Sequence, residues 1–213
     1  MKIQIRSDRV HISGYVNAVE RWSRPLTDKD GKRFIEKIAA GAFRRALEEA
    51  PRVGVMLNHE RTLTDTQSDA VRLEEDSIGL RFDGDIFDPE VIAEAKQKQL
   101  RGWSFGFRPG TELKATTDQP GVDYTRTLES LDLLEVSIID QRKLPAYPAT
   151  SVEVRDGGEI ELRVAETENV EVEEDGDVND ELRTEPGELP PQEEAQAMPD
   201  VEMMRKRLRL RSI

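Results

Sequence analysis

Short stretches in which apolar and polar residues alternate run through the first 155 residues of this 213-residue chain. In "RVGVMLNH", for example, the alternation places His59 on the same face as the apolar side chains before it. A period of two is typical of strands that bury one face, and turn-forming residues separate the stretches. Such a pattern limits this part of the chain to a mainly β fold. The expected strands cover residues 2–6, 12–19, 52–59, 69–75, 79–87, 103–107 and 124–140, and "DSIG" joins two of them as a hairpin.

Two segments carry the marks of helices instead. "GAFRRALEEA" has apolar side chains at i, i+3, i+4 and i+7 counted from Phe43, which is the spacing of one helix face. "DPEVIAEAKQKQL" begins with Asp88, a residue suited to the N-cap, and continues with Pro89, whose missing N–H costs nothing at the first helical position. The expected architecture is therefore mainly β, closed or sandwiched, with two helices attached.

The charge of the chain is concentrated after residue 155. The formal net charge is −13, and residues 156–194 alone hold 16 acidic side chains against two arginines. This stretch has few large apolar residues and no aromatic one, so it cannot bury enough surface to offset the entropy lost on ordering. We therefore expect a folded domain over 1–155 and an acidic disordered linker over 156–198.

The last segment, 199–213, regains a pattern. Val201, Met204 and Leu208 fall on one face of a basic helix. Two interpretations stay open for this helix: a solvated end that frays, or a docking element for an acidic or apolar partner.

Composition excludes several classes of function. Without the tail the chain is close to neutral, so no basic face for nucleic acid is expected. No apolar run is long enough to cross a bilayer, and the first residues lack the apolar stretch of a signal peptide. The chain has no cysteine and only two histidines, His11 and His59, which are far apart. We therefore expect a soluble cytoplasmic protein with no cofactor and no metal site, because a catalytic zinc would have too few ligands.

Ser104 lies in a G-x-S-x-G spelling, within "GWSFG". The α/β-hydrolase elbow with this spelling needs a histidine after the serine, and here both histidines precede it. As part of a strand, Ser104 faces away from three aromatic neighbours. His59 is then the candidate base and Glu135 the candidate acceptor behind it, set among apolar residues. From spacing alone, a non-catalytic role also stays open for each residue: a structural serine, a surface or core histidine, and a glutamate that pairs with an arginine.

Six stretches in order resemble the prohead maturation proteases of tailed bacteriophages. The resemblance implies a serine peptidase with a closed, barrel-like fold similar to that of the herpesvirus assemblins. It implies His59 and Ser104 as catalytic residues, with Glu135 as the best candidate for the acid; His11 is expected to have no catalytic part. After His59 the sequence departs from the family pattern, which leaves the neighbouring loop in doubt. The stretches are "GYVNAV", "RFIEKIAAGAFRRAL", "VGVMLNHE", "DSIGLRFDGDI", "GWSFGFRP", and "LLEVSIID" followed by "PAYPATSVEVR".

The function expected from this resemblance is cleavage of scaffold segments and of the major capsid protein inside the assembling prohead, in the host cytoplasm. The acidic linker is an accessible substrate for self-cleavage, because a protease needs extended backbone. Self-association is expected as well, and nucleic acid and membrane are not expected partners. The alternative is a non-catalytic assembly or scaffold protein with the same fold.

Overall fold

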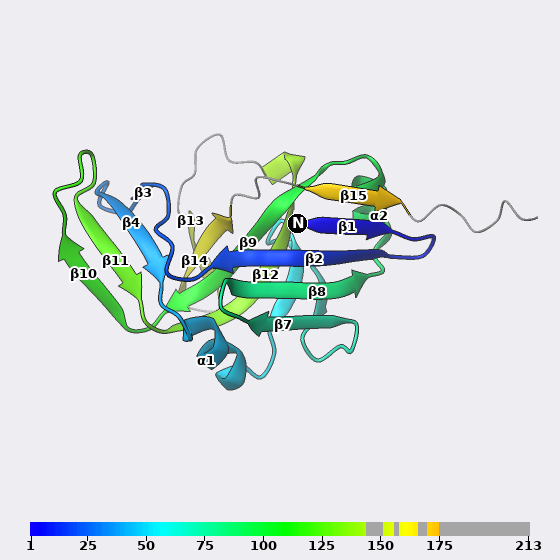
Figure 1. Ribbon diagram of the computed structural model, residues 1–213, viewed down its shortest axis with the longest axis horizontal. Coiled ribbons are helices and arrows are strands. Elements are labelled where there is room, and N and C mark those ends of the chain that lie inside the picture. Colours follow the sequence, from blue (N-terminus) through cyan, green and yellow to red (C-terminus); the bar gives the residue numbers. More distant parts are fainter. Residues whose placement is uncertain (144–150, 156–157, 166–169, 175–213) are drawn as a thin grey trace, which may run out of the picture. The chain divides into compact units, whose positions relative to one another are not determined.

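The computed structural model describes residues 1–143, 151–155, 158–165 and 170–174. By contacts the chain divides into two units, Met1–Gly176 and Asp177–Ile213, and all described residues belong to the first. The expected basic helix at 199–213 lies outside the described residues, as does the linker beyond residue 174. Within the described residues the chain forms three β-sheets and two α-helices, which confirms the mainly β prediction (Figure 1).

Each sheet brings together strands that are far apart in the sequence. The five-stranded sheet has the order β15 (Glu171–Glu174), β1 (Lys2–Ile5), β2 (Val10–Ala18), β8 (Gly79–Ile86) and β7 (Val71–Glu75). The four-stranded sheet has the order β10 (Glu112–Thr116), β11 (Tyr124–Leu128), β4 (Arg33–Ile38) and β3 (Leu26–Thr27). The six-stranded sheet has the order β13 (Ser151–Arg155), β14 (Gly158–Ala165), β9 (Leu100–Pro109), β12 (Leu131–Asp140), β5 (Gly54–Leu57) and β6 (Arg61–Asp65).

The expectation of a closed barrel is wrong for this structure. A barrel closes when the two outer strands of one sheet pair with each other. In each of the three sheets the outer strands have a single neighbour among the described residues, so the sheets are open. The fifteen described strands are divided among three sheets, so each sheet has few strands. Register shifts in β2–β8, β12–β9 and β5–β6 interrupt the pairing further.

The two helices occur where the sequence predicts them. They are α1 (Ala42–Glu49) and α2 (Pro89–Lys96), and a 3₁₀ turn follows β12 at Gln141–Lys143. The carboxylate of Asp88 accepts hydrogen bonds from the backbone N–H groups of Glu90 and Val91, so it caps α2 as expected. No helix in the described part of the chain is long and apolar enough to span a bilayer.

The predicted strand over 124–140 is two strands in the structure. β11 ends at Leu128, and β12 begins at Leu131 in another sheet. The break occurs where the N–H groups of Glu129 and Ser130 both bond to the carbonyl of Thr111, at 2.9 and 3.3 Å. These bonds turn the chain from one sheet to the next. The alternating pattern continues through the same residues, so it predicts one uninterrupted strand.

The predicted linker contains ordered strands at its start. β14 and β15 both lie inside 156–198, the segment expected to be disordered. Ile160 and Leu162 of β14 are buried, and β15 pairs in parallel with β1. β14 is ordered because it has enough apolar surface to join the sheet and because its charged residues find partners of opposite sign that are distant in the sequence.

A single apolar core joins residues of the five-stranded sheet, the six-stranded sheet and both helices. Its largest members are the aromatic residues of β9, with Phe43 and Phe82 packed against them. β9 therefore lies at the centre of the molecule's first unit, held on one face by this core. Its other face carries the candidate site.

Candidate active site

Ser104 lies on β9 with its side chain away from the aromatic core. Side chains alternate along a strand, so Trp103, Phe105 and Phe107 occupy the core face and Ser104 and Gly106 the opposite face. The three aromatic residues are buried, and Ser104 itself has 0% exposed surface. Packing on one face of β9 thus fixes where the serine hydroxyl points on the other.

His59 is held by a tight turn between β5 and β6. Asn58 and His59 have φ angles of +54° and +63°, and the N–H of Glu60 bonds to the carbonyl of Leu57 at 3.1 Å. Two central residues with positive φ are the requirement of a type I′ hairpin turn. The direction of the imidazole therefore comes from the turn and not from the alternation of the strand before it, which corrects the geometric basis on which His59 was predicted.

β12 fixes this turn with hydrogen bonds. The backbone N–H of His59 donates to Ser137 Oγ at 2.9 Å, and the N–H of Asn58 donates to the carbonyl of Ile138 at 2.9 Å. The Asn58 side chain donates to Asp140 Oδ2 at 2.8 Å and accepts from the Asp140 N–H at 3.1 Å. Because left-handed conformations of non-glycine residues are strained, these bonds offset the cost of holding His59 in place.

The structure brings the three predicted residues together in one buried cluster, which we call the serine cluster: His59, Ser104 and Glu135. His59 Nε2 lies 2.7 Å from Ser104 Oγ, and His59 Nδ1 lies 2.5 Å from Glu135 Oε1. All three side chains are buried. A carboxylate at Nδ1 favours the tautomer with a proton there, which leaves Nε2 free to accept the proton of a hydroxyl.

Glycine residues lie opposite Glu135 on both neighbouring strands, and one of them makes room for its side chain. In the six-stranded sheet Glu135 lies opposite Gly54 of β5 and Gly106 of β9. A Cβ atom added to Gly106 would lie 2.9 Å from Glu135 Cγ, closer than a real Cβ contact, whereas one added to Gly54 would lie 3.7 Å from Glu135 Cβ, an ordinary contact. The second glycine of the G-x-S-x-G spelling therefore leaves space for the carboxylate side chain behind the histidine.

The hydroxyl of Ser104 has a second neighbour that the sequence does not predict. Ser104 Oγ lies 2.8 Å from the backbone carbonyl oxygen of Arg163, to which it can donate. A serine hydroxyl has a single proton, so the Arg163 carbonyl and His59 Nε2 compete for it. The backbone of β14 is thus in direct contact with the most reactive group of the cluster.

A further group of charged residues lies behind the His59 turn. Arg142 donates to Asp140 Oδ2 and to Glu94 Oε1, each at 2.7 Å. Burial, with the charge of Asp140 beside it, raises the pKa of Glu94 to about 7. Burial also acts to raise the pKa of Asp140, but hydrogen bonds from Arg142 and Asn58 outweigh it and hold that pKa below its ordinary value. The sequence contains no motif that marks this group.

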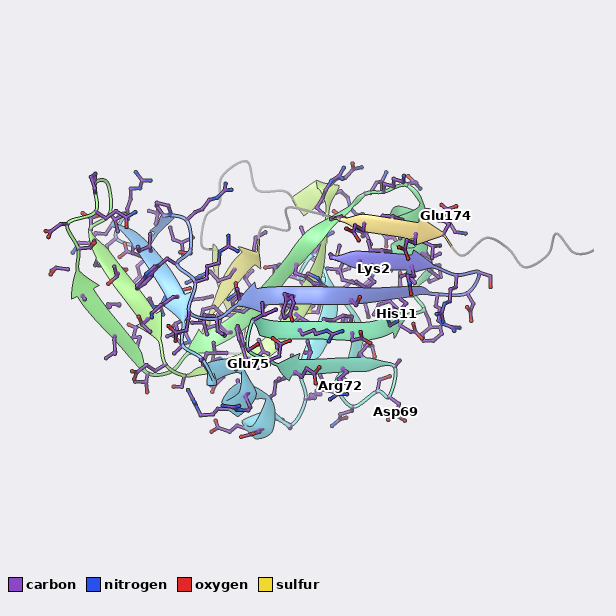
Figure 2. All side chains as sticks on the ribbon, in the orientation of Figure 1. Lys2, His11, Asp69, Arg72, Glu75 and Glu174 are labelled. Carbon is purple, nitrogen blue, oxygen red and sulfur yellow. The ribbon has the colours of Figure 1, made fainter. Side chains whose placement is uncertain are left out.

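The other histidine lies elsewhere. His11 is on β2, where its Nδ1 lies 3.0 Å from Asp85 Oδ1 on the paired strand β8 (Figure 2). The described residues contain no group of three or more histidine, aspartate or glutamate side chains arranged to hold a metal ion. The serine cluster itself consists of a hydroxyl, an imidazole and a carboxylate in sequence.

Comparison with known proteins gives one finding. Residues 1–163 match the family model described as the caudovirus prohead serine protease. No curated protein and no solved structure matches the chain. The match includes all three residues of the serine cluster and ends within β14, at Arg163.

Proposed function

Because the chain belongs to the caudovirus prohead serine protease family, we propose that it is a serine endopeptidase that cleaves the major capsid protein and scaffold segments within the assembling prohead. The observation that carries this proposal is the hydrogen-bonded series from Ser104 through His59 to Glu135. A hydroxyl becomes a nucleophile at neutral pH when a base accepts its proton, and an acceptor behind the base holds it in the required orientation.

In the proposed mechanism each residue has a separate role. Ser104 Oγ attacks the carbonyl carbon of the substrate peptide bond, and its proton passes to His59 Nε2. His59 then gives this proton to the departing amine, and a water molecule hydrolyses the acyl-enzyme by the same route in reverse. Glu135 stabilises the charged imidazole and keeps Nδ1 as the protonated nitrogen. None of these steps requires a cofactor.

The tail has a proposed role in the same process. The acidic segment after the described strands is a candidate for self-cleavage, because extended backbone is what a protease binds. The basic segment 199–213 is proposed to dock on capsid or scaffold protein and to carry the enzyme into the shell. Self-association completes the proposal as a means of activation when the enzyme is concentrated.

The test is co-expression of the full chain with its capsid protein, followed by separation of the shortened capsid product on a gel. Ser104→Ala and His59→Ala should each remove nearly all cleavage, about 10⁶-fold in rate constant, and the double variant should lose little more because the residues act as a unit. Ser137→Ala is the matched control, since Ser137 is also buried and lies directly opposite Ser104 in the sheet. It should reduce cleavage about tenfold or less by loosening the His59 turn.

The outcome that would contradict the proposal is equally direct. A capsid protein that is shortened at the normal rate by the Ser104→Ala variant would show that the chain acts as an assembly scaffold and that another protease does the cutting.

A further inference from the structure

β14 occupies the side of β9 that lies beside Ser104. The two strands pair in antiparallel fashion, with Val164 opposite Ser104 and Arg163 opposite Phe105. Extended peptides commonly bind proteins by adding such a strand to a sheet, with backbone bonds for affinity and pockets for alternate side chains. A peptide substrate must bring a backbone carbonyl group to Ser104 Oγ, and in this structure the carbonyl oxygen of Arg163 lies 2.8 Å from that atom.

The side chain of Arg163 enters a fitted pocket on the core side of β9. Its Nε and Nη2 atoms donate to the two carboxylate oxygens of Glu36, at 2.9 and 3.1 Å. Its guanidinium carbon lies 5.2 Å from the centre of the Phe107 ring, within the range of a cation–π contact. Arg163 and Glu36 are both buried. A bidentate carboxylate and an aromatic face together recognise a guanidinium closely, and an ammonium less so.

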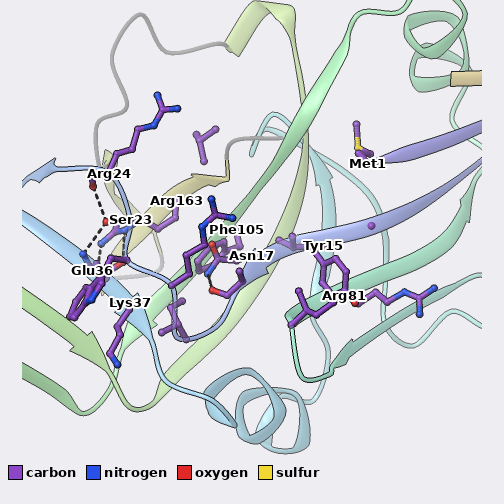
Figure 3. Close-up of a pocket in the computed structure, with 18 of the residues that line it drawn as sticks. Met1, Tyr15, Asn17, Ser23, Arg24, Glu36, Lys37, Arg81, Phe105 and Arg163 are labelled. Carbon is purple, nitrogen blue, oxygen red and sulfur yellow. Dashed lines mark hydrogen bonds and ion pairs between the residues drawn. The ribbon is translucent and has the colours of Figure 1, made fainter. Parts of the chain in front are cut away.

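The pocket opens into a larger hollow at the surface. Glu36, Phe105, Arg163 and Val164 are among the residues that line a cavity of about 810 Å³, and Figure 3 shows Arg163 and Glu36 close together there. The next residue, Val164, is 38% exposed. The peptide bond from Arg163 to Val164 thus has its carbonyl oxygen beside Ser104 Oγ, and the residue after it is partly exposed.

We propose that β14 lies in the substrate position of this enzyme, with Arg163–Val164 as the bond presented to Ser104. The pocket of Glu36 and Phe107 then selects an arginine, or less strongly a lysine, immediately before the bond that is cut. This inference rests on the proposed function and adds to it the substrate class and the first self-cleavage position. It also makes β14 an internal competitor, because other substrates reach Ser104 only when this strand leaves.

The reaction balances as a hydrolysis. Ser104 Oγ bonds to the carbonyl carbon of Arg163, the carbon–nitrogen bond to Val164 breaks, and the proton of the hydroxyl passes through His59 to the nitrogen of Val164. Water then releases Arg163 as a free carboxylate and returns the proton to Ser104. The products are residues 1–163 and a fragment that begins with Val164.

The first experiment follows self-cleavage of the purified full chain by intact-mass spectrometry. We expect a fragment that begins with Val164, and Arg163→Gln should slow its appearance about 100-fold or more, because the bidentate ion pair with Glu36 is lost. Arg163→Lys keeps the positive charge and should slow self-cleavage much less. Arg9→Gln is the matched control: Arg9 pairs with the Asp85 carboxylate at 3.2 Å in the five-stranded sheet, and its described contacts do not join it to Glu36 or Ser104. It should lower thermal stability, leave the cleavage position unchanged and change the cleavage rate by no more than a few-fold.

The second experiment adds a peptide that copies residues 158–169, and a matched peptide with glutamine at the position of Arg163. The full chain should cut the first peptide and not the second. Arg163→Gln in the protein should cut the arginine peptide faster than the unchanged protein does, because its own strand competes less, while Glu36→Gln should raise KM for that peptide. A purely structural ion pair would not move self-cleavage and peptide cleavage in opposite directions.

The outcomes separate the two proposals. A fragment that begins elsewhere than Val164, or equal cleavage of both peptides, would overturn the assignment of β14 and its pocket while the protease itself stands. Self-cleavage that persists in the Ser104→Ala variant would overturn the proposed function.

Discussion

Two buried polar clusters lie on opposite sides of β9, and they differ in what their protons can do. The serine cluster joins a hydroxyl, an imidazole and a carboxylate. The second, which we call the arginine cluster, consists of Glu36, Arg126, Glu161 and Arg163. An arginine does not lose its proton in a protein, whereas an imidazole can accept and release one near neutral pH and a hydroxyl can pass its proton to such a base. One cluster is therefore suited to moving protons, and the other to holding fixed charge.

The pKa shifts in the arginine cluster agree with this division. Burial acts to lower the pKa of Arg126, but its hydrogen bonds with Glu161 and the charge of Glu36 raise it above the ordinary value. Burial likewise acts to raise the pKa of Glu161, and the two arginines outweigh it and lower that pKa. Arg126 and Glu161 are thus both driven further into their charged forms. A single strand can in this way separate chemistry on one face from recognition on the other.

The strongest test of this comparison is to replace one glutamate by glutamine in each cluster. Glu135→Gln should lower kcat about 10³- to 10⁴-fold, because a neutral amide no longer favours the reactive tautomer or stabilises the charged imidazole. Glu36→Gln should act mainly on KM for substrates with arginine before the cut bond. Steady-state kinetics on the arginine peptide would check both changes. An equal fall in kcat from the two variants would remove the division between chemistry and recognition.

A smaller effect is expected from the glycine residues that flank Glu135. Gly106→Ala places a Cβ 2.9 Å from Glu135 Cγ, so the carboxylate must shift and the imidazole loses its alignment. Activity should fall about 100-fold, since small displacements in a catalytic group have effects of this size. Gly54→Ala is the control, because its Cβ would make an ordinary contact with the same residue at 3.7 Å. If both variants kept full activity, the position of Glu135 would not matter to the mechanism.

The smallest effect concerns Glu94, a buried carboxyl that belongs to neither cluster. Its pKa in the folded chain, about 7, is above its ordinary value of 4.5, so folding favours the protonated form. Ionisation of this carboxyl therefore lowers the free energy of unfolding. The decrease grows as the pH rises from 4.5 to 7, and it stays at its full size above pH 7. Glu94→Gln removes this penalty, and its stability gain over the unchanged chain should grow by about 2 kcal/mol between about pH 5 and pH 8.

Urea unfolding at both pH values measures this gain. Glu90→Gln serves as the control, because Glu90 contacts the same Arg142 at 3.1 Å from a more exposed position. It should change the pH dependence less than Glu94→Gln does, because the charge of Glu90 is only one contribution to the raised pKa of Glu94. A Glu94→Gln variant whose gain shrinks at higher pH would show that Glu94 is charged in the folded chain.

Local alternation predicts a large part of this molecule. It correctly gives the hairpin of β7 and β8, both helices and the face of β9 on which Ser104 lies. These features depend on residues that are neighbours along the chain, and a period of two or of 3.6 is visible there. Ser104, His59 and Glu135 could be selected as candidates because few residue types support a hydroxyl nucleophile and the chain has only two histidines.

The parts that sequence could not predict depend on distant pairing. Nothing beside Arg163 in the sequence shows that Glu36 lies against it, because β4 and β14 are more than a hundred residues apart. The acidic composition around Arg163 instead predicts a disordered segment. This prediction is wrong for β14, where Arg163 pairs with the buried carboxylate of Glu36. The open sheets are a similar case, since whether outer strands pair is decided by the number and length of all strands together and not by any one segment.

β12 contributes Glu135, Ser137 and Asp140, so one strand supplies the acid of the site and two anchors of the His59 turn. A ribosome makes the chain from its N-terminus, and β12 emerges after both Ser104 and His59. A nascent chain that ends before β12 has its serine but neither a held histidine nor the acid behind it. On the proposed mechanism, translation itself therefore delays the appearance of proteolytic activity until β12 can join the sheet, which protects the half-made chain from cutting itself.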